Sequence, residues 1–463
     1  MASRNQRHRA RKRKNRVIVV GLDGVPYTYI QKLFRLGELP NFRAIVDGGA
    51  LVQMDTTLPN ASPVAWSSFM TGKNPGKHSI YGFVDREPGS LRTFMPSPRT
   101  LHAPVLGELM ATAGKRVFVM SVPLTFPPRQ ASGMLVGCFL GTNRHKAASN
   151  AEAGESPWGL NPCIDADPRP SRQDKDNFLL DLDEVFEWRV AAMRYLWCQE
   201  PWDLFVAHIM ETDWLHHFFW KEMEQGDARY VPTFLEFYRR IDQVFGEVRA
   251  WLDEETTLIV LSNHGFCTIK QEVYINTWLH RAGYLQYSRE QPEGLHDMAP
   301  SSTAYSLDSG RIFLNVRGRE PRGRIARAAE YERVRREIAE AAMTMADPVT
   351  GEPMVRRVYM REELYHGPYA HAAPDLVLAM HDGYDPKELF GKQELTFKGD
   401  ARVGMHTTPD ALLYIRGLHH IDRRPSITDV APTILDHLGV PVPHDMDGCS
   451  LLRESECNVK KTF

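Results

Sequence analysis

Residues 17–24 read Val-Ile-Val-Val-Gly-Leu-Asp-Gly, an apolar run that ends in an acidic residue followed by glycine. β-Branched residues without polar alternation are typical of a parallel strand that is buried on both faces. Asp23 therefore falls at the carboxyl end of this strand, where open α/β sheets bind their ligands. An acidic residue there is often only a turn former. The nearby Gly21 and Gly24, however, indicate a close approach of the backbone to a bound ion.

Similar apolar runs alternate with helical patterns along the rest of the chain, which is the βαβ pattern of a parallel sheet covered on both faces. The sequence thus predicts an α/β fold with a mostly parallel sheet sandwiched by helices. The clearest predicted helices are a stripe of Phe234, Tyr238, Ile241, Phe245, Val248 and Leu252, and a segment from about Thr428 to His437. The predicted strands are Val17–Leu22, Ala50–Met54, Arg116–Ser121, Asp203–His208, Thr256–Ser262, Asp375–Met380 and Ala411–Ile415.

The length and two interruptions of this pattern predict the domain organisation. At 463 residues the chain exceeds a usual single core, so we expect an inserted second domain. Residues 140–178 are rich in Asn, Pro, Ser and charge, and we expect a long excursion there. The core strands are expected to resume only at Asp375. The predicted division is a basic tail at 1–16, a catalytic core at 17–265 and 373–452, an inserted cap at 266–372 and a C-terminal tail at 453–463.

The composition is that of a soluble globular protein, with 43% hydrophobic and 25% charged residues. No run approaches the roughly 18 consecutive apolar residues that a membrane span requires. The cysteines are scattered without C-x-x-C pairs, which argues against a disulfide framework and against a thiolate zinc site. We therefore expect reduced thiols and a cytoplasmic protein. The cysteines are Cys138, Cys163, Cys198, Cys267, Cys449 and Cys457.

The net charge of −2 hides an asymmetry between the N-terminal tail and the rest of the chain. Residues 1–16 carry eight Arg or Lys and no acidic residue, so taking these +8 charges from −2 leaves −10 for the remainder. The tail has no apolar segment of the kind that a secretory signal requires. We expect a solvated tail, with weak contact to nucleic acid or an anionic surface as the alternative. Nucleic acid is not expected to be the main partner of so acidic a body.

Ser62-Pro63 opens a short predicted helix that runs to Thr71 and is closed by Gly72. Serine suits the N-cap and proline the first helical position, so one interpretation is a simple helix cap. The other is a nucleophile, because a hydroxyl at this place feels the positive end of the helix dipole.

Asp213 and His217 are four residues apart, just after a predicted strand. On a helix this spacing puts both side chains on one face, which is typical of metal-ligand pairs and also of surface ion pairs. His216 points elsewhere and is expected to be structural. Asn263-His264-Gly265 ends the strongest strand, and a polar turn there is hard to explain by packing.

His406 lies directly before the predicted strand that starts at Ala411, and alone it would be regarded as incidental. Together with the segments above it completes a set of three histidines, two carboxylates, an amide and a hydroxyl. This set suits two adjacent divalent ions, Zn²⁺ first and Mn²⁺ as the alternative. Two metals roughly 4 Å apart stabilise both the attacking and the leaving oxygen of a phosphoryl transfer.

At these segments the chain resembles the alkaline phosphatase superfamily, and particularly its type I phosphodiesterase/nucleotide pyrophosphatase branch. Within that branch it is most similar to bacterial proteins described as predicted phosphohydrolases or phosphomutases. The resemblance covers about residues 17–452 and implies an alkaline-phosphatase-like fold with an inserted cap. The motifs that carry it are VIVVGLDG, TLPNASPVAWSSFMTGKNPGKH, ETDWLHHFFW, LSNHGF, GMHTTPDALLYIRG and APTILDHLGVPVPHDMDG.

The resemblance implies a hydrolase that acts on the phosphoric ester bond of a small phosphorylated substrate. Ser62 would be the nucleophile and would form a phosphoseryl intermediate that water then hydrolyses. Two alternatives remain: a phosphomonoesterase or phosphomutase of the same superfamily, and a binding protein that has lost catalysis. The implied ligands are Asp213, His217 and His406 for one metal, and Asp23, Ser62, Asn263 and His264 for the second.

The chain departs from the family pattern at two positions and from the related sulfatases at a third place. The family usually has aspartate where Asn263 stands; an amide oxygen can ligate, but without charge the second metal should bind more weakly. Nucleotide pyrophosphatases place an asparagine against the phosphoryl group near the position of Phe83, and its absence here argues against a nucleotide diester as substrate. The segment 62–66 lacks the C/S-x-P-x-R pattern of sulfatases. Candidate substrate contacts are Lys77, His78 and Arg86, whose alternative role is surface charge.

Overall fold

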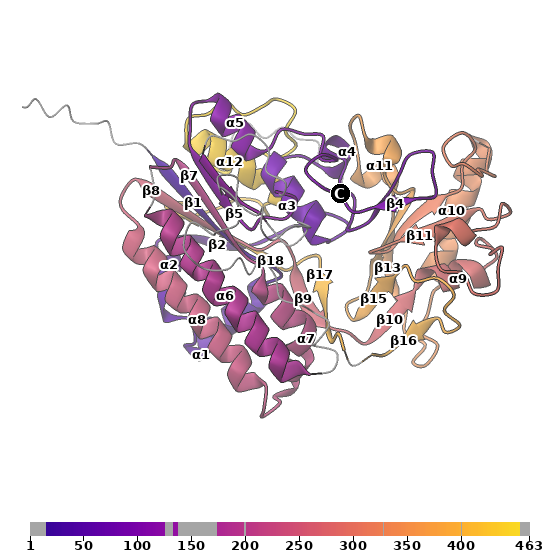
Figure 1. The fold of residues 1–463 in the computed structure, drawn as a ribbon, viewed down its shortest axis with the longest axis horizontal. Helices are drawn as coiled ribbons and strands as arrows, with labels where there is room; N and C mark the ends of the chain where they lie inside the picture. The colour runs from indigo at the N-terminus through magenta and orange to yellow at the C-terminus, as the bar shows by residue number, and fades with distance from the viewer. Residues whose placement is uncertain are drawn as a thin grey trace, which may run out of the picture.

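A computed structural model describes residues 15–125, 133–137, 174–198, 201–326, 328–399 and 401–453. Its centre is a seven-stranded sheet in which β1 is the middle strand (Figure 1). In spatial order the strands are β2 (Gly49–Met54), β18 (Ala411–Arg416), β8 (Thr256–Leu261), β1 (Arg16–Leu22), β7 (Leu204–Ile209), β5 (Val117–Met120) and β6 (Gly133–Val136).

The sheet is mostly parallel, which confirms the predicted fold class. β1 pairs in parallel with β7 and β8, and β5 pairs in parallel with β7 and β6, whereas β18 is antiparallel to both of its neighbours. Side chains of β1 alternate between two apolar layers, as the period of a strand requires. Val17 and Val19 pack into one layer, and Ile18, Val20 and Leu22 into the other.

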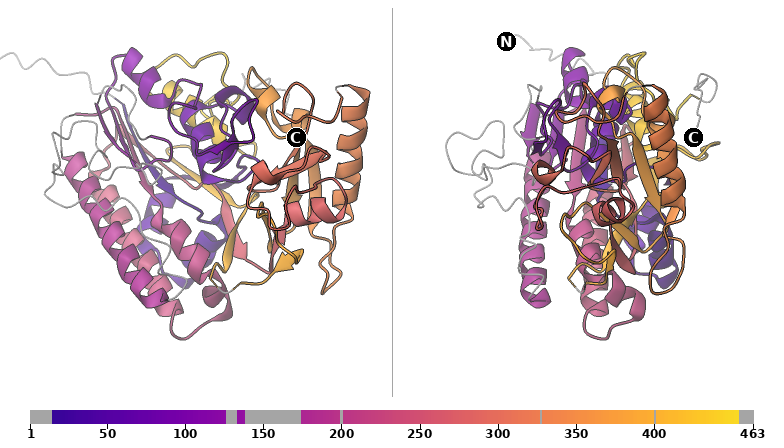
Figure 2. Two further views of the ribbon diagram at one scale, coloured as in Figure 1. Left: turned by 45° about the vertical axis from the view of Figure 1, so that its right-hand side comes forward. Right: turned by 90° about the vertical axis from the view of Figure 1, so that its right-hand side faces the viewer.

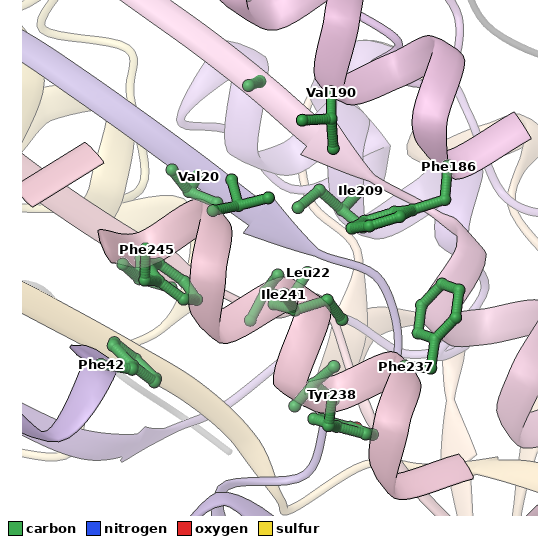
Figure 3. Close-up of a cluster of buried hydrophobic side chains, with 14 of the residues drawn as sticks. Val20, Leu22, Phe42, Phe186, Val190, Ile209, Phe237, Tyr238, Ile241 and Phe245 are labelled. Atoms are coloured by element: carbon green, nitrogen blue, oxygen red, sulfur yellow. The ribbon is translucent and has the colours of Figure 1, made fainter. Parts of the chain in front are cut away.

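Helices cover both faces of the sheet (Figures 1 and 2). The stripe predicted on α8 is buried against the sheet, where Tyr238, Ile241 and Phe245 lie near Val20 and Leu22 (Figure 3). One face carries α1 (Tyr27–Leu36), α2 (Pro40–Val46), α6 (Lys175–Trp197), α7 (Glu211–Gln225) and α8 (Val231–Trp251). The other carries α3 (Ser62–Thr71), α5 (Leu106–Thr112) and α12 (Val430–His437).

A second region with its own apolar core lies beside the central sheet, on the right of Figure 1. Its four-stranded sheet has the order β11 (Ala304–Leu307), β12 (Arg311–Leu314), β14 (Leu376–Met380), β13 (Val355–Met360). Its three-stranded sheet has the order β15 (Tyr384–Lys387), β10 (Gln271–Tyr274), β16 (Thr396–Phe397). The helices α9 (Ile275–Arg281), α10 (Ala329–Met343) and α11 (Arg361–Leu364) accompany these sheets.

The prediction that Asp375–Met380 returns to the core sheet is wrong. The strand exists as β14, but it pairs with β12 and β13 and packs into the second core. Its apolar run is buried on both faces, and a buried run does not reveal which sheet it joins. The chain returns to the core at β17 (Gly404–Thr407), which pairs with β9 (Gly265–Thr268). We therefore propose that the cap extends from about residue 269 to about residue 399.

Three further predictions can be compared with the structure. Cys198 and Cys267 have free thiols, but Cys449 is disulfide-bonded, so the expectation of reduced thiols is wrong there and no longer supports a cytoplasmic location.

No described helix is both long and apolar enough to cross a membrane. The helix α6 already begins within the excursion predicted for 140–178. Residues 1–14, 138–173 and 454–463, with Cys138, Cys163 and Cys457, lie outside the described residues.

The contact between β1 and α3 leads to a testable prediction. A Cβ on Gly21 would lie 2.5 Å from the ring of Trp66, so Gly21→Ala should overpack the core. We expect a loss of about 1–3 kcal/mol in the free energy of unfolding, measured by urea denaturation. Gly48→Ala is the control, because its Cβ would meet Ile45 O at 3.4 Å and the Tyr414 hydroxyl at 3.9 Å, both ordinary contacts. Equal unfolding midpoints for the two variants would contradict the packing described.

Candidate active site

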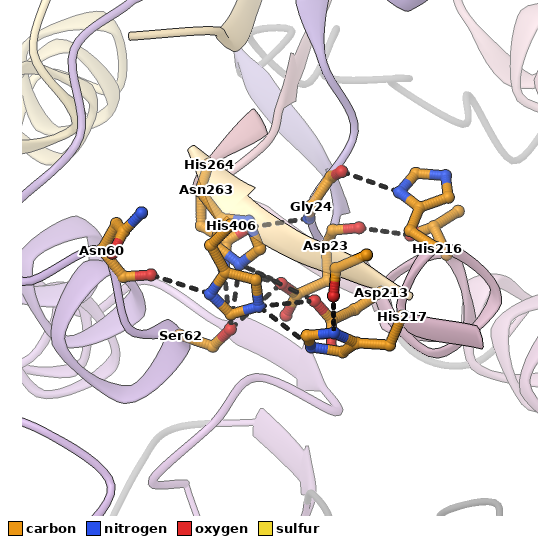
Figure 4. A network of polar contacts seen from close by, with 12 residues as sticks. Asp23, Gly24, Asn60, Ser62, Asp213, His216, His217, Asn263, His264 and His406 are labelled. Carbon is orange, nitrogen blue, oxygen red and sulfur yellow. Dashed lines mark hydrogen bonds and ion pairs between the residues drawn. The ribbon is translucent and has the colours of Figure 1, made fainter. Parts of the chain in front are cut away.

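The carboxyl ends of three neighbouring parallel strands meet at one edge of the sheet. Asp23 follows β1, the helix α7 follows β7, and Asn263-His264 follow β8. Ser62 reaches the same place from the start of α3, and His406 reaches it from β17 (Figure 4). All seven residues predicted as ligands or nucleophile are therefore brought together, although they are spread over more than 380 positions of the chain.

Ser62 is the first residue of α3, and the preceding Ala61 occupies the N-cap position. The predicted N-cap is thus displaced by one residue, a usual uncertainty at helix ends. The Ser62 hydroxyl makes no capping bond and is free for the site: Oγ donates to Asp23 Oδ1 at 3.2 Å and lies 3.3 Å from His264 Nε2. It lies at the positive end of a ten-residue helix, which favours negative charge on this oxygen.

Asp213, His217 and His406 form a compact donor set. His406 Nε2 lies 3.1 Å from both Asp213 Oδ1 and His217 Nε2, and His217 Nε2 lies 3.4 Å from Asp213 Oδ2. Nδ1 of each histidine faces a backbone carbonyl, at Gly404 for His217 and at Asn60 for His406, so Nδ1 donates and Nε2 keeps its lone pair. Tetrahedral zinc at about 2.05 Å from its ligands spaces them about 3.3 Å apart. The three residues therefore fit a metal ion.

The electrostatic surroundings keep these ligands in the form that binds metal. Burial lowers the pKa of His217 well below its usual value and that of His406 to about 4, and nearby Arg402 lowers both further. Both imidazoles are thus neutral at pH 7. Burial, followed by the charge of Asp23, raises the pKa of Asp213 to about 7. A cation would relieve this cost, because it stabilises the ionised carboxylate.

A second donor group consists of Asp23, Asp213 and His264, whose ligand atoms lie within 4.8 Å of one another. His264 Nε2 is 3.3 Å from Asp23 Oδ1 and 3.8 Å from Asp213 Oδ1. Asp213 thus contributes to both groups, whereas the sequence placed it in the first only. Asn263 lies beside this group, with Nδ2 at 2.6 Å from Asp23 Oδ1.

Sequence reasoning missed two residues that hold Asp23. Trp66 Nε1 donates to Asp23 Oδ2 at 3.0 Å, and His208 Nε2 lies 2.9 Å from the same oxygen. Together with His264, His208 lowers the pKa of Asp23 well below its usual value, against the effect of burial. A histidine inside the apolar strand β7 was the available signal for His208.

As the sequence predicted, His216 lies outside both donor sets and has a structural role. Its Nδ1 lies 2.9 Å from Gly24 O and its Nε2 lies 2.8 Å from the Tyr238 hydroxyl, so both ring nitrogens have structural partners. The neighbouring histidines on α7 therefore serve different purposes.

The three candidate substrate contacts lie elsewhere. Lys77 pairs with Asp447, His78 is fully buried with Nε2 2.9 Å from Ser68 Oγ, and Arg86 pairs with Glu320 at 2.9 Å. None of the three lines the cleft at the donor sets. Their side chains have partners within the fold, which removes the basis for a substrate role.

A cleft of about 330 Å³ opens directly above the donor sets, between the core and the second region. Asp23, Ser62 and His406 lie on its core side, and Val377, Ala379 and Lys387 lie on the opposite side. Phe83 also lines it. Three cations reach the cleft, namely Arg356, Lys387 and Arg402. Arg356 and Lys387 belong to the cap and Arg402 precedes β17, and none of the short motifs indicated these positions.

Solved structures share this architecture. Phosphonoacetate hydrolase from Sinorhizobium meliloti 1021, in complex with phosphonoformate, matches with a TM-score of 0.62 at 17% identity, covering 92% of this chain and 96% of that chain. Wild-type alkaline phosphatase PafA matches with a TM-score of 0.57 at 12% identity, covering 96% and 99%. An inactive variant of murine ectonucleotide pyrophosphatase/phosphodiesterase 5, in complex with AMP, matches with a TM-score of 0.54 at 14% identity, covering 93% and 97%.

The matched structures show the same fold, with a mostly parallel central sheet. The family model described as type I phosphodiesterase / nucleotide pyrophosphatase matches residues 17–408. The chain belongs to this family and is a hydrolase that acts on phosphoric ester bonds. The resemblance inferred from the motifs is thereby confirmed.

The raised pKa of Asp213 leads to a prediction for the metal-free protein. The carboxyl titrates near 7 when folded and near 3.8 when unfolded, so its contribution to stability is complete below pH 3.8 and is lost as pH rises through 7. The free energy of unfolding of the wild type, relative to Asp213→Asn, should thus fall by roughly 1–3 kcal/mol between pH 4 and 7.5. Urea denaturation of chelator-treated protein measures it. Parallel curves for the two proteins would refute the burial effect.

Proposed function

We propose that the protein is a metal-dependent phosphodiesterase that cleaves its substrate through a phosphoseryl intermediate on Ser62. The observation that carries the proposal is the position of Ser62 Oγ. This buried hydroxyl lies at a helix N-terminus, within 3.3 Å of Asp23 and His264, and faces the cleft. A nucleophile of this class needs an acceptor for its proton and stabilisation of its negative charge, and this place supplies both.

We propose two divalent metal positions, suited to Zn²⁺ with Mn²⁺ as the alternative. Asp213, His217 and His406 would hold the first ion. When bound, the ions supply positive charge that stabilises the oxygens of the phosphoryl group. The second position lies beside Asp23, Ser62, Asn263 and His264, and it would bind its ion so weakly that we expect only the first ion at rest.

The proposed reaction uses the Ser62 hydroxyl and the two groups that can accept its proton. Ser62 Oγ forms a bond to phosphorus while the bond from phosphorus to the leaving oxygen breaks. The hydroxyl proton has two acceptors in reach, Asp23 Oδ1 at 3.2 Å and His264 Nε2 at 3.3 Å, and it ends on the leaving oxygen. Water then breaks the Oγ–phosphorus bond, releases the phosphorylated product and restores the hydroxyl.

The cleft supports a small phosphorylated substrate. Its volume of about 330 Å³ suits a compact molecule, and Arg402 lies in its wall without an ion-pair partner among the described residues. A guanidinium in this position is suited to bind an anionic group of the substrate. A nucleotide is one such molecule, and the murine relative binds AMP.

Ser62→Ala tests the nucleophile. Without Oγ no phosphoseryl bond can form, so kcat against bis-p-nitrophenyl phosphate should fall by roughly 10³-fold or more. Ser67→Ala is the matched control, because Ser67 is buried on the same helix and its Oγ has no hydrogen-bond partner among the described residues. Its activity should stay at the wild-type level. Unchanged hydrolysis by Ser62→Ala would refute the proposed mechanism, and faster cleavage of the p-nitrophenyl monoester would favour a phosphomonoesterase.

Neighbouring histidines on α7 test the first metal position. His217→Gln removes a ligand and should weaken Zn²⁺ binding by more than about 100-fold, measured by titration against a competing chelator. His216→Gln should lower stability but keep Zn²⁺ affinity, because His216 bonds only to Gly24 and Tyr238. Equal losses of affinity in the two variants would show that the set containing His217 is not the metal site.

A further inference from the structure

We infer that Asn263 occupies the second metal position with its own amide group, so that the resting enzyme holds one metal ion. This inference rests on the proposed function, because it concerns the same site. It starts from the orientation of the Asn263 side chain, which is completely buried.

The backbone N–H of Gly24 fixes this orientation. It donates to Asn263 Oδ1 at 2.9 Å, so the amide oxygen points toward the turn after β1. Gly24 has a φ of +65°, and a Cβ there would lie 2.6 Å from Phe266 and 2.9 Å from His264. The turn therefore requires glycine, and it holds the N–H in this direction. The expectation that the amide oxygen of Asn263 ligates a metal is not met, because that oxygen faces away from the donor atoms.

The amide nitrogen faces the donor atoms instead. Nδ2 donates to Asp23 Oδ1 at 2.6 Å and to Ser62 Oγ at 3.1 Å. An amide NH₂ has two donors and no lone pair to offer a cation. Turning the amide over would lose the bond to Asp23 and the bond from Gly24, and it would place two oxygens against each other. The amide group thus contacts Asp23 and Ser62, which the family resemblance assigns to the second ion.

Both carboxylate oxygens of Asp23 also have polar partners from the protein without a second ion. An ionised carboxylate offers about four lone-pair positions. Five groups lie close to its two oxygens: Asn263 Nδ2, Ser62 Oγ and His264 Nε2 near Oδ1, and Trp66 Nε1 and His208 Nε2 near Oδ2. A metal at Asp23 would have to displace at least one of them.

The first donor set, in contrast, contains no amide that donates hydrogen bonds to its ligands. The Nε2 atoms of His217 and His406 lie 3.1 Å apart with their lone pairs toward each other and toward Asp213, and no amide stands between them. Such an arrangement is repulsive until a cation fills it. The first position therefore offers open lone pairs of all three ligands to a metal, whereas at the second the Asn263 amide already bonds to Asp23 and Ser62, and only His264 and Asp213 stay open.

Asn263 also acquires a role in positioning the nucleophile. Its N–H bond to Ser62 Oγ holds this oxygen next to its proton acceptors and remains available when the oxygen becomes charged. The amide N–H thus places a partial positive charge next to Ser62 Oγ, where a second cation would place a full positive charge.

Asn263→Asp is the decisive variant. It would place a second carboxylate oxygen 2.6 Å from Asp23 Oδ1, and two buried carboxylates at this distance need a cation or a proton between them. Chelator-treated wild type and variant are loaded with Zn²⁺, freed of excess metal and analysed by mass spectrometry of the metal content. We expect about one equivalent for the wild type and about two for Asn263→Asp, with the second ion bound about tenfold or more tightly in the variant.

Thermal unfolding with and without Zn²⁺ provides a readout that does not depend on activity. Metal-free Asn263→Asp should melt below metal-free wild type, and Zn²⁺ should raise its melting temperature by more. Asn263→Ala is the control: it removes the amide without adding a carboxylate, so a second ion should bind far more weakly than in Asn263→Asp.

The outcomes separate the inference from the proposed function. Two tightly bound equivalents in the wild type, or no additional ion in Asn263→Asp, would overturn the inference while leaving a metal-dependent enzyme. No bound metal in the wild type, together with full activity of Ser62→Ala, would overturn the proposed function itself.

Discussion

The charge of Asp23, buried at the end of the central strand, is the constraint on which the rest of the site depends. A carboxylate with 2% exposure is stable only if donors replace the water it has lost. Here three donors come from separate parts of the chain, Ser62 and Trp66 from α3 and Asn263 from the end of β8, and His208 Nε2 of β7 lies 2.9 Å from Oδ2. Folding therefore brings these elements to one point, and the same bonds that neutralise Asp23 orient the nucleophile.

The wall of the cleft opposite this carboxylate depends on a second group of buried charges. Arg311 is fully buried and bonds to Asp85 and Asp308, while Arg86 pairs with Glu320. Asp85 and Arg86 follow the nucleophile helix in sequence, whereas their partners belong to the second region. Because breaking one partner of a buried pair is costly, these pairs tie the two regions together. The cleft is thus bounded by two parts whose spacing is set by ion pairs rather than by apolar packing alone.

Sequence patterns predicted what depends on local order. Apolar runs located the strands of the sheet, and residues at strand ends converged because neighbouring parallel strands end at the same edge. The spacing of Asp213 and His217 sufficed to place both on one face of α7. The sheet joined by β14 and the contacts of Lys77 could not be predicted, since both depend on partners far away in the chain. The direction of the Asn263 amide depends on one N–H in a distant turn, and no sequence pattern records it.

Asparagine in place of aspartate at position 263 changes the electrostatics of the site more than its shape. With aspartate at position 263, as the family resemblance implies, two carboxylates would lie beside Ser62 and would need a cation or a shared proton between them. With Asn263 the chain keeps the same backbone and the same nucleophile, but one negative charge is gone and a donor stands in its place. His208 and Trp66 complete the neutralisation of Asp23 on the opposite side. These contacts support one another: Asn263 adds no negative charge beside Asp23, and the contacts of Trp66 and His208 on Oδ2 leave Oδ1 to the neutral amide and to Ser62.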